Sequence, residues 1–112
     1  MRLLIKGTTL DITPALKVYI EAKLGRLLKL LEKMEVKQEF LLRVEVARTT
    51  RHHNKGQVYY AEANLDIGKV VLRAESENWN ARLAINEVYR ELAGEIKKFK
   101  GRLSERPKNK RT

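Results

Sequence analysis

The chain has 112 residues and a formal net charge of +10, because 24 lysines and arginines face only 14 aspartates and glutamates. A hydrophobic fraction of 43% and a charged fraction of 34% are typical of one soluble globular domain with a basic surface. The absence of cysteine excludes disulfides, thiolate metal sites and cysteine nucleophiles. No apolar run has the roughly 20 residues of a membrane span, and a signal-peptide pattern is missing, so we expect a cytoplasmic protein without membrane contact.

A strand and a helix are predicted first. Residues 2–7 form a short apolar run that ends at a glycine, which is typical of a strand. Thr13 followed by Pro14 predicts a helix start, because a hydroxyl can cap free N–H groups and proline suits the first helical position. We expect this helix to run to about Lys33. Its apolar side chains recur at steps of three and four and predict one buried stripe: Leu16, Ile20, Leu24, Leu27, Leu28 and Leu31.

Three further strands are predicted by alternating apolar residues. Residues 39–50 and 57–68 each alternate with a period of two, and residues 69–76 follow a turn at Gly68. The segment 52–56 between the first two is predicted to be a hairpin tip. The side chains expected to face the core are Phe40, Leu42, Val44, Val46, Tyr59, Ala61, Ala63, Leu65 and Ile67.

A second helix is predicted near the C-terminus, with Ser76 as its cap and Gly101 as its end. Its expected core stripe comprises Ala81, Ile85, Val88, Leu92, Ile96 and Phe99. Residues 1–101 would then form the folded domain, and residues 102–112 a basic, flexible tail.

This order of elements, β-α-β-β-β-α, predicts an α+β sandwich. A right-handed crossover through the first helix would place the first two strands in parallel, and the remaining strands would continue as an antiparallel meander. The result is a four-stranded mixed sheet with two helices packed on one face.

The positive charge is concentrated on the predicted helices. Arg26, Lys29 and Lys33 fall opposite the leucine stripe, with Lys23 on its flank. Helix-dipole effects explain cations in a last helical turn only, so the cations beyond Gly101 favour a polyanion such as structured RNA over a merely solvated tail. The aromatic fraction of 6% argues against a single-strand stacking platform. Eight cations lie in the last sixteen positions: Lys97, Lys98, Lys100, Arg102, Arg106, Lys108, Lys110 and Arg111.

The adjacent histidines His52 and His53 are the only imidazoles in the chain. Neighbouring residues of an extended chain point to opposite faces, and a metal site would need further ligands that neither histidine nor cysteine supplies. A Ser–His–acid group would have to use Ser76, expected as a helix cap, or Ser104, in the expected tail. We therefore expect no enzyme, no metal and no cofactor, and we interpret the histidines as hydrogen-bond donors to phosphate or ribose.

Several stretches resemble the ribosome hibernation-promoting factors, also called ribosome-associated inhibitors. They are "DITPALKVYIEAKLGRL" at 11–27, "TTRHHNKGQVYYAEANL" at 49–65, "VLRAES" at 71–76 and "NARLAINEVYRELAGEIKKFK" at 80–100. In the last stretch Asn80, Arg82 and Asn86 stand where many members have an acid, an aromatic residue and an acid. The length resembles that of the short members, which lack an extra C-terminal domain.

The resemblance implies a monomer when free that binds rRNA of the small ribosomal subunit in the channel between head and body, with no small-molecule substrate. There it would exclude mRNA and tRNA and silence translation under stress. A general RNA- or DNA-binding module and a small hydrolase using the histidine tip remain alternatives. The candidate RNA-binding residues, taken from the charge pattern and the resemblance together, are Lys23, Arg26, Lys29, Lys33, Arg51, His52, His53, Lys55, Arg73, Lys97, Lys98, Lys100 and Arg102.

Overall fold

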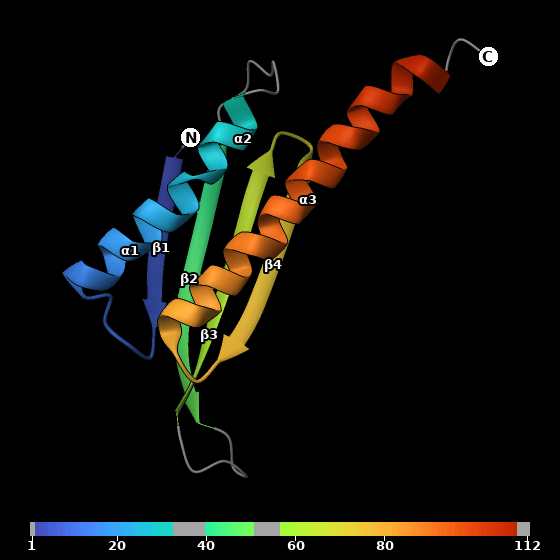
Figure 1. Cartoon of the computed structure of the whole chain (residues 1–112). Coiled ribbons are helices and arrows are strands. Elements are labelled where there is room, and N and C mark those ends of the chain that lie inside the picture. Colours follow the sequence, from blue (N-terminus) through green and yellow to red (C-terminus); the bar gives the residue numbers. More distant parts are fainter. Residues whose placement is uncertain (1, 33–39, 51–56, 110–112) are drawn as a thin grey trace.

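The computed structural model describes residues 2–32, 40–50 and 57–109 and has the predicted two-layer architecture (Figure 1). Four strands form one sheet in the order β1-β2-β3-β4, and the helices cover one face of it. We call the surface formed by the helices the helix side and the uncovered face of the sheet the open face. The elements are β1 (Arg2–Thr8), α1 (Pro14–Gly25), α2 (Leu27–Glu32), β2 (Leu41–Thr50), β3 (Gln57–Ile67), β4 (Val70–Asn78) and α3 (Ala81–Asn109).

The sheet topology confirms the prediction of a mixed sheet. β1 and β2 pair in parallel, with Ile5 opposite Val44, as expected when a helical crossover joins them. β2, β3 and β4 form an antiparallel meander. The turn between β3 and β4 contains Gly68 with φ of 65°, a left-handed conformation that glycine adopts without steric cost.

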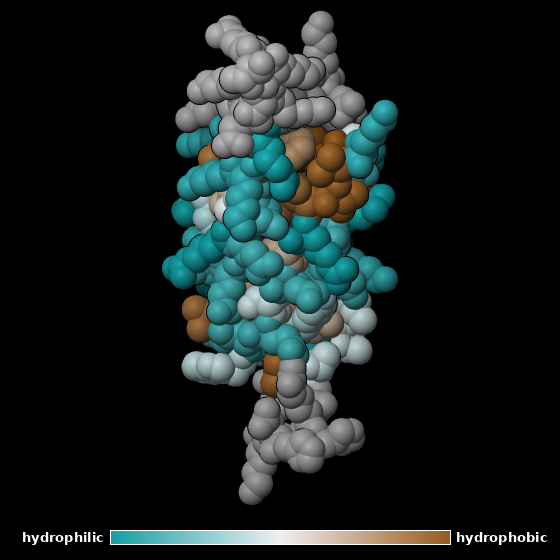
Figure 2. Space-filling view, turned by 90° about the vertical axis from the view of Figure 1, so that its right-hand side faces the viewer, coloured by the Kyte–Doolittle hydropathy of each residue, from teal (hydrophilic) through white to brown (hydrophobic). Residues whose placement is uncertain are grey.

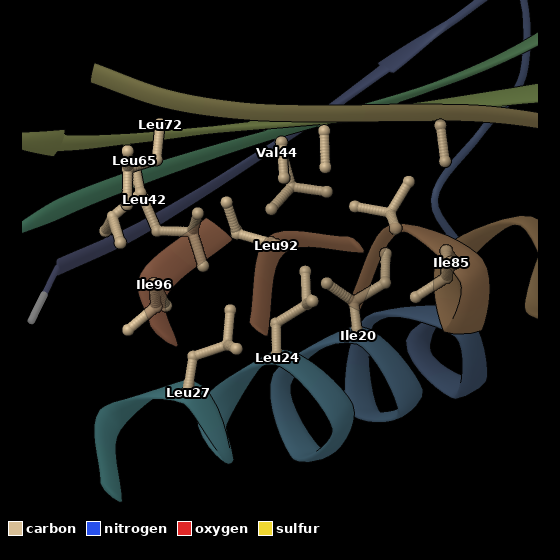
Figure 3. Close-up of a cluster of buried hydrophobic side chains, with 14 of the residues drawn as sticks. Ile20, Leu24, Leu27, Leu42, Val44, Leu65, Leu72, Ile85, Leu92 and Ile96 are labelled. Atoms are coloured by element: carbon tan, nitrogen blue, oxygen red, sulfur yellow. The ribbon is translucent and has the colours of Figure 1, made fainter. Parts of the chain in front are cut away.

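The core lies between the sheet and the helices, where the labelled side chains of both layers point toward one another (Figure 3). The period-two pattern places alternate strand residues there, and the three-to-four pattern does the same for the helices. Ala84 is also buried on α3, a position that the predicted stripe did not contain. Tyr59 and Phe99, expected in the core, are only half-buried. The side chains that are at most 1% exposed include Ile20, Leu24, Leu27, Leu42, Val46, Leu65, Ile85, Val88, Leu92 and Ile96.

The connection from β1 to α1 packs closely on the end of β1. A Cβ added to Gly7 would lie 2.6 Å from the carbonyl oxygen of Leu10 and 2.9 Å from Cγ1 of Ile12, so only glycine fits. Thr9 has φ of 62°, which is an unusual conformation for a β-branched residue. Its hydroxyl accepts a hydrogen bond from the Arg48 N–H at 3.0 Å, which ties the connection to β2.

The predicted helix from Pro14 to about Lys33 is present as two joined helices, α1 and α2, with an interruption at Arg26 that was not predicted. The Arg26 N–H is 3.4 Å from the carbonyl oxygen of Lys23, and the Lys29 N–H bonds to the carbonyl of Arg26 at 3.2 Å, which are tight three-residue steps. Gly25, with its low helix propensity, directly precedes the break. The stripe still continues across it, since Leu24 and Leu27 are both fully buried. Lys33 lies outside the described residues.

Both predicted ends of the last helix are wrong. Ser76 belongs to β4, and Asn80 caps α3 by accepting hydrogen bonds from the N–H groups of Arg82 at 2.9 Å and Leu83 at 3.1 Å. α3 also continues beyond Gly101 to Asn109. A glycine within a helix costs about 1 kcal/mol relative to alanine, and the flanking lysines and arginines are good helix formers. The division of the chain into a domain and a tail at residue 101 stays a prediction.

Candidate nucleic-acid interface

The helix side is held together by two contacts between a cation and an aromatic ring. The Lys23 ammonium of α1 lies 5.2 Å from the ring centroid of Tyr89 on α3. In the opposite direction, the Arg82 guanidinium of α3 lies 5.2 Å from the ring centroid of Tyr19 on α1. The Tyr19 hydroxyl also donates a hydrogen bond to the carbonyl of Arg82 at 3.4 Å. These pairs fix α1 against α3 while each cation keeps its charge, because a ring attracts a cation without neutralising it.

The remaining predicted cations of the first helical segment are open to solvent. Arg26 forms the cap between α1 and α2 and is exposed, and Lys29 is exposed on α2. No ion pair involves either of them within the part of the chain that the structure describes. Their charges are therefore available to a polyanion.

α3 has a basic flank and a mixed flank. Lys100 lies about three turns beyond Tyr89, so it shares the flank that faces α1, and the exposed Lys97 lies next to this flank. Arg90 is exposed there too, one helical heptad before Lys97. Two of the predicted cations, and one that was not predicted, thus lie on or next to the flank of α3 that faces α1.

The other flank of α3 carries glutamates that face β4. Glu87 accepts hydrogen bonds from the Ser76 hydroxyl at 2.8 Å and the Asn78 amide at 3.2 Å. Lys98 lies farther along the same flank, and its ammonium is 3.6 Å from the Glu95 carboxylate. Figure 2 shows the side of the molecule formed by α3 and β4, where hydrophilic residues cover most of the surface. Arg102 follows Lys98 by four residues and therefore shares its face of α3. Both cations thus lie apart from the flank of α3 that faces Lys23.

Arg73 is separated from all of these cations, because it lies on the open face of the sheet. Its guanidinium is 2.9 Å from Glu75 and 3.4 Å from Glu62, so two carboxylates neutralise it. Between them the Tyr60 hydroxyl lies 2.7 Å from Glu75 and 2.9 Å from Glu62. The amide of Asn64 donates to Glu62 at 3.0 Å and completes the cluster. The structure does not bring Arg73 together with the helical cations.

Titration of this cluster follows from its hydrogen bonds. Burial and the two adjacent carboxylates raise the pKa of Tyr60 far above its ordinary value, because both disfavour the phenolate. The hydrogen bonds from Tyr60 and Arg73 lower the pKa of Glu75. The Tyr60 hydroxyl and the two carboxylates raise the pKa of Arg73. The cluster is thus a hydrogen-bonded network in which one cation, Arg73, is shared by two carboxylates, Glu62 and Glu75.

The candidate residues Lys33, Arg51, His52, His53 and Lys55 lie outside the described residues, so their placement stays a prediction. Within the described ranges 2–32, 40–50 and 57–109, no group of three or more histidines, cysteines, aspartates or glutamates could hold a metal ion. No helix in these ranges is long and apolar enough to cross a membrane.

Sequence reasoning missed the roles of Tyr19, Arg82, Tyr89 and Arg90. Arg90 precedes Lys97 by seven residues, about two helical turns, so the sequence alone could have placed both cations on one face of the helix. The contact between Tyr19 and Arg82 joins residues 63 positions apart, and no local pattern indicates such a pair.

Comparison with known proteins decides the family. The model of the family described as "Sigma 54 modulation protein / S30EA ribosomal protein" matches residues 3–104. The chain belongs to this family. A curated relative, the "Ribosome hibernation promotion factor" of Lactococcus lactis subsp. cremoris (strain MG1363), is 28% identical over 106 residues. That match covers 94% of this chain and 52% of the relative, so the chain spans about half the relative's length.

Two solved structures resemble this member of the family. The N-terminal domain of Protein Y from Thermus thermophilus is 25% identical with a TM-score of 0.70, and the match covers 88% of this chain and 99% of that domain. A ribosomal subunit interface protein from Coxiella burnetii has a TM-score of 0.68 at 20% identity, covering 90% of this chain and 99% of that one. The second likeness concerns the fold alone.

Proposed function

We propose that this protein binds rRNA of the small ribosomal subunit in the decoding channel and silences translation under stress by excluding mRNA and tRNA. The observation that carries the proposal is the set of cations on the helix side that are bound to a ring or have no ion pair among the described residues, which includes Lys23, Arg26 and Lys100. Membership of the S30EA family supports it, as does a curated relative named as a ribosome hibernation promotion factor.

Inhibition by occupancy requires a rigid basic body and no reacting group. The α1–α3 ring contacts hold Lys23 and Arg82 in place, and the sheet packs behind both helices. Lysine and arginine contacts to phosphates orient the protein on the RNA, while its bulk excludes other ligands from the same space. Binding releases the counterions of each neutralised phosphate, so affinity falls as the salt concentration rises.

Co-sedimentation with purified small subunits at about 50 and 200 mM salt tests this proposal. We expect the protein to sediment with small subunits at low salt and to be released at high salt. Pre-bound protein should also prevent binding of tRNA and mRNA to the same subunits. Failure to sediment at low salt, or unchanged tRNA and mRNA binding at full occupancy, contradicts the proposal.

A general RNA-binding module is the second candidate function, because cations on helices bind any polyanion. A structured RNA unrelated to the ribosome distinguishes the two. Comparable affinity for this RNA and for small subunits, measured at the same salt concentration, favours the general module. A clear preference for small subunits favours the hibernation function.

A further inference from the structure

A cavity lies at the end of the sheet where α1 and α3 begin. Figure 1 shows that the first turns of both helices lie at this end of the sheet. It has a volume of about 700 Å³, within the range of small-molecule sites. The β1–α1 connection, the first turn of α1, the adjacent ends of β2 and β3 and the start of α3 surround it. Its lining consists of Gly7, Thr9, Leu10, Asp11, Thr13, Leu16, Arg48, Tyr59 and Ala81.

Three polar groups of this lining are unused. Among the described residues, the Arg48 guanidinium, the Tyr59 hydroxyl and the Asp11 carboxylate have no hydrogen-bond or ion-pair partner. Arg48 and Asp11 line the same cavity without pairing with each other. On the open face, by contrast, an arginine and a tyrosine have partners: Arg73 and Tyr60 both contact carboxylates.

The wall that carries these groups is rigid. The backbone of Arg48 is fixed from both sides, because the Thr9 hydroxyl accepts from its N–H at 3.0 Å and donates to its carbonyl oxygen at 2.5 Å. Thr9 itself is held at φ of 62°, and Gly7 leaves no free space toward Leu10. The Arg48 guanidinium, which has no partner among the described residues, thus extends from a fixed backbone position, and this reduces the entropy lost when a ligand binds.

We propose that this cavity binds a single nucleotide, with its phosphate on Arg48 and its base against the ring of Tyr59. A guanidinium binds phosphate through two parallel hydrogen bonds, and an aromatic ring stacks on an unpaired base. The Asp11 carboxylate is an acceptor for a ribose hydroxyl or a base N–H. Two helices also begin at the cavity, and the positive ends of their dipoles favour an anion there.

The combination of groups favours a nucleotide over simpler anions. Inorganic phosphate would use Arg48 but would leave the Tyr59 ring and most of the volume unfilled. A site for one nucleotide also agrees with the aromatic fraction of 6%, since it needs one ring where a single-strand platform needs several. The inference deepens the proposed function and rests on it for the source of the nucleotide, which we take to be an unstacked residue of rRNA. A free nucleotide carries the same phosphate and base and would use the same groups.

Binding of the four ribonucleoside 5′-monophosphates tests the inference. Trp79, the only tryptophan, is 76% exposed and lies two residues before Ala81, so its fluorescence is a direct readout alongside NMR shifts. We expect saturable binding that weakens at least tenfold in Arg48→Gln, and a weaker response to nucleosides and to inorganic phosphate. Tyr59→Leu should weaken nucleotide binding but leave phosphate binding unchanged.

Arg43→Gln is the matched control. Arg43 lies on the same strand and is exposed on the open face, and its substitution removes the same charge. Equal losses in Arg43→Gln and Arg48→Gln would show a non-specific charge effect and overturn the inference. Absence of saturable binding by any monophosphate to the folded wild-type protein also overturns it.

Two further experiments distinguish an RNA residue from a free nucleotide as the ligand, and distinguish failure of this inference from failure of the proposed function. A short unpaired RNA that competes with the monophosphate supports an RNA residue as the ligand, and lack of competition supports a free nucleotide. Wild-type protein that sediments with small subunits but binds no nucleotide refutes only this inference. Protein that binds nucleotide without sedimenting refutes the proposed function instead.

Discussion

The two surfaces of this protein carry charge in different ways. On the helix side, Lys23 lies over an aromatic ring and Arg26 has no ion pair with any residue that the structure describes, so positive charge stays available. On the open face Arg73 is held between Glu62 and Glu75, and like-charged glutamates face each other across the strands. The open face has nearly balanced charges, with Arg2, Lys6, Arg43 and Arg73 against Glu45, Glu62, Asp66, Glu75 and Glu77.

This difference teaches that the net charge of +10 does not describe the surface a partner meets. A polyanion approaching the helix side meets cations on α1, α2 and α3, while the same polyanion at the open face meets arginines with acidic neighbours. Because salt screens exposed charges beyond about 10 Å, the local arrangement decides binding more than the sum does.

The largest expected effect is on the free energy of unfolding, through the core side chains beneath the helix side. Leu24→Ala removes a fully buried side chain between α1, α3 and the sheet and should lower the free energy of unfolding by about 2–5 kcal/mol. Urea denaturation measures this loss. Val18→Ala on the same helix is the control, since Val18 is 64% exposed and should change stability by less than about 0.5 kcal/mol. Equal losses would show that the packing of α1 is misassigned.

Charge reversal tests the comparison itself. The double change Arg26→Glu and Lys97→Glu should weaken RNA binding at low salt by about 100-fold, or about 2.7 kcal/mol, because two phosphate contacts become repulsive. The slope of log affinity against log salt should fall by roughly one for each phosphate that the variant no longer neutralises. Lys6→Glu with Arg43→Glu on the open face changes the net charge equally. A similar loss in this control would mean that overall charge, not the helix side, governs binding.

The ring contacts should have a smaller effect. Tyr89→Leu keeps an apolar side chain but removes the quadrupole beneath Lys23, so we expect a loss of about 0.5–1 kcal/mol in stability. A double-mutant cycle with Lys23→Met isolates the pair. A coupling energy of zero would show that Lys23 and Tyr89 are neighbours without an interaction.

The smallest effect concerns the pH dependence of the open face. The lowered pKa of Glu75 makes a stabilising contribution that is present above its unfolded value of about 4.5 and is lost as the pH falls through the folded value. The raised pKa of Tyr60 has the opposite sign: its contribution is present below about pH 10 and is lost at higher pH. Tyr60→Phe should flatten both limbs in urea titrations. An unchanged profile contradicts the network.

Local patterns predicted most of the secondary structure. The period-two alternation in β2 and β3 and the stripe from Ile20 to Leu31 are confirmed, because burial of one face imposes its period directly on the sequence. The break at Arg26, the cap at Asn80 and the end at Asn109 were missed. Each depends on about 1 kcal/mol of local preference, which neighbouring residues easily outweigh.

The sequence by itself determined the elements, their order and the surplus of cations on the helices, since these depend on neighbours along the chain. Only the tertiary structure decided which charges act together. It placed Arg73 on the open face with its acids, Arg82 over Tyr19, and Arg48 beside Thr9 in a cavity with Tyr59. The physical reason is that these contacts join distant segments, and which distant side chains meet is settled by strand register and helix packing, not by local periodicity.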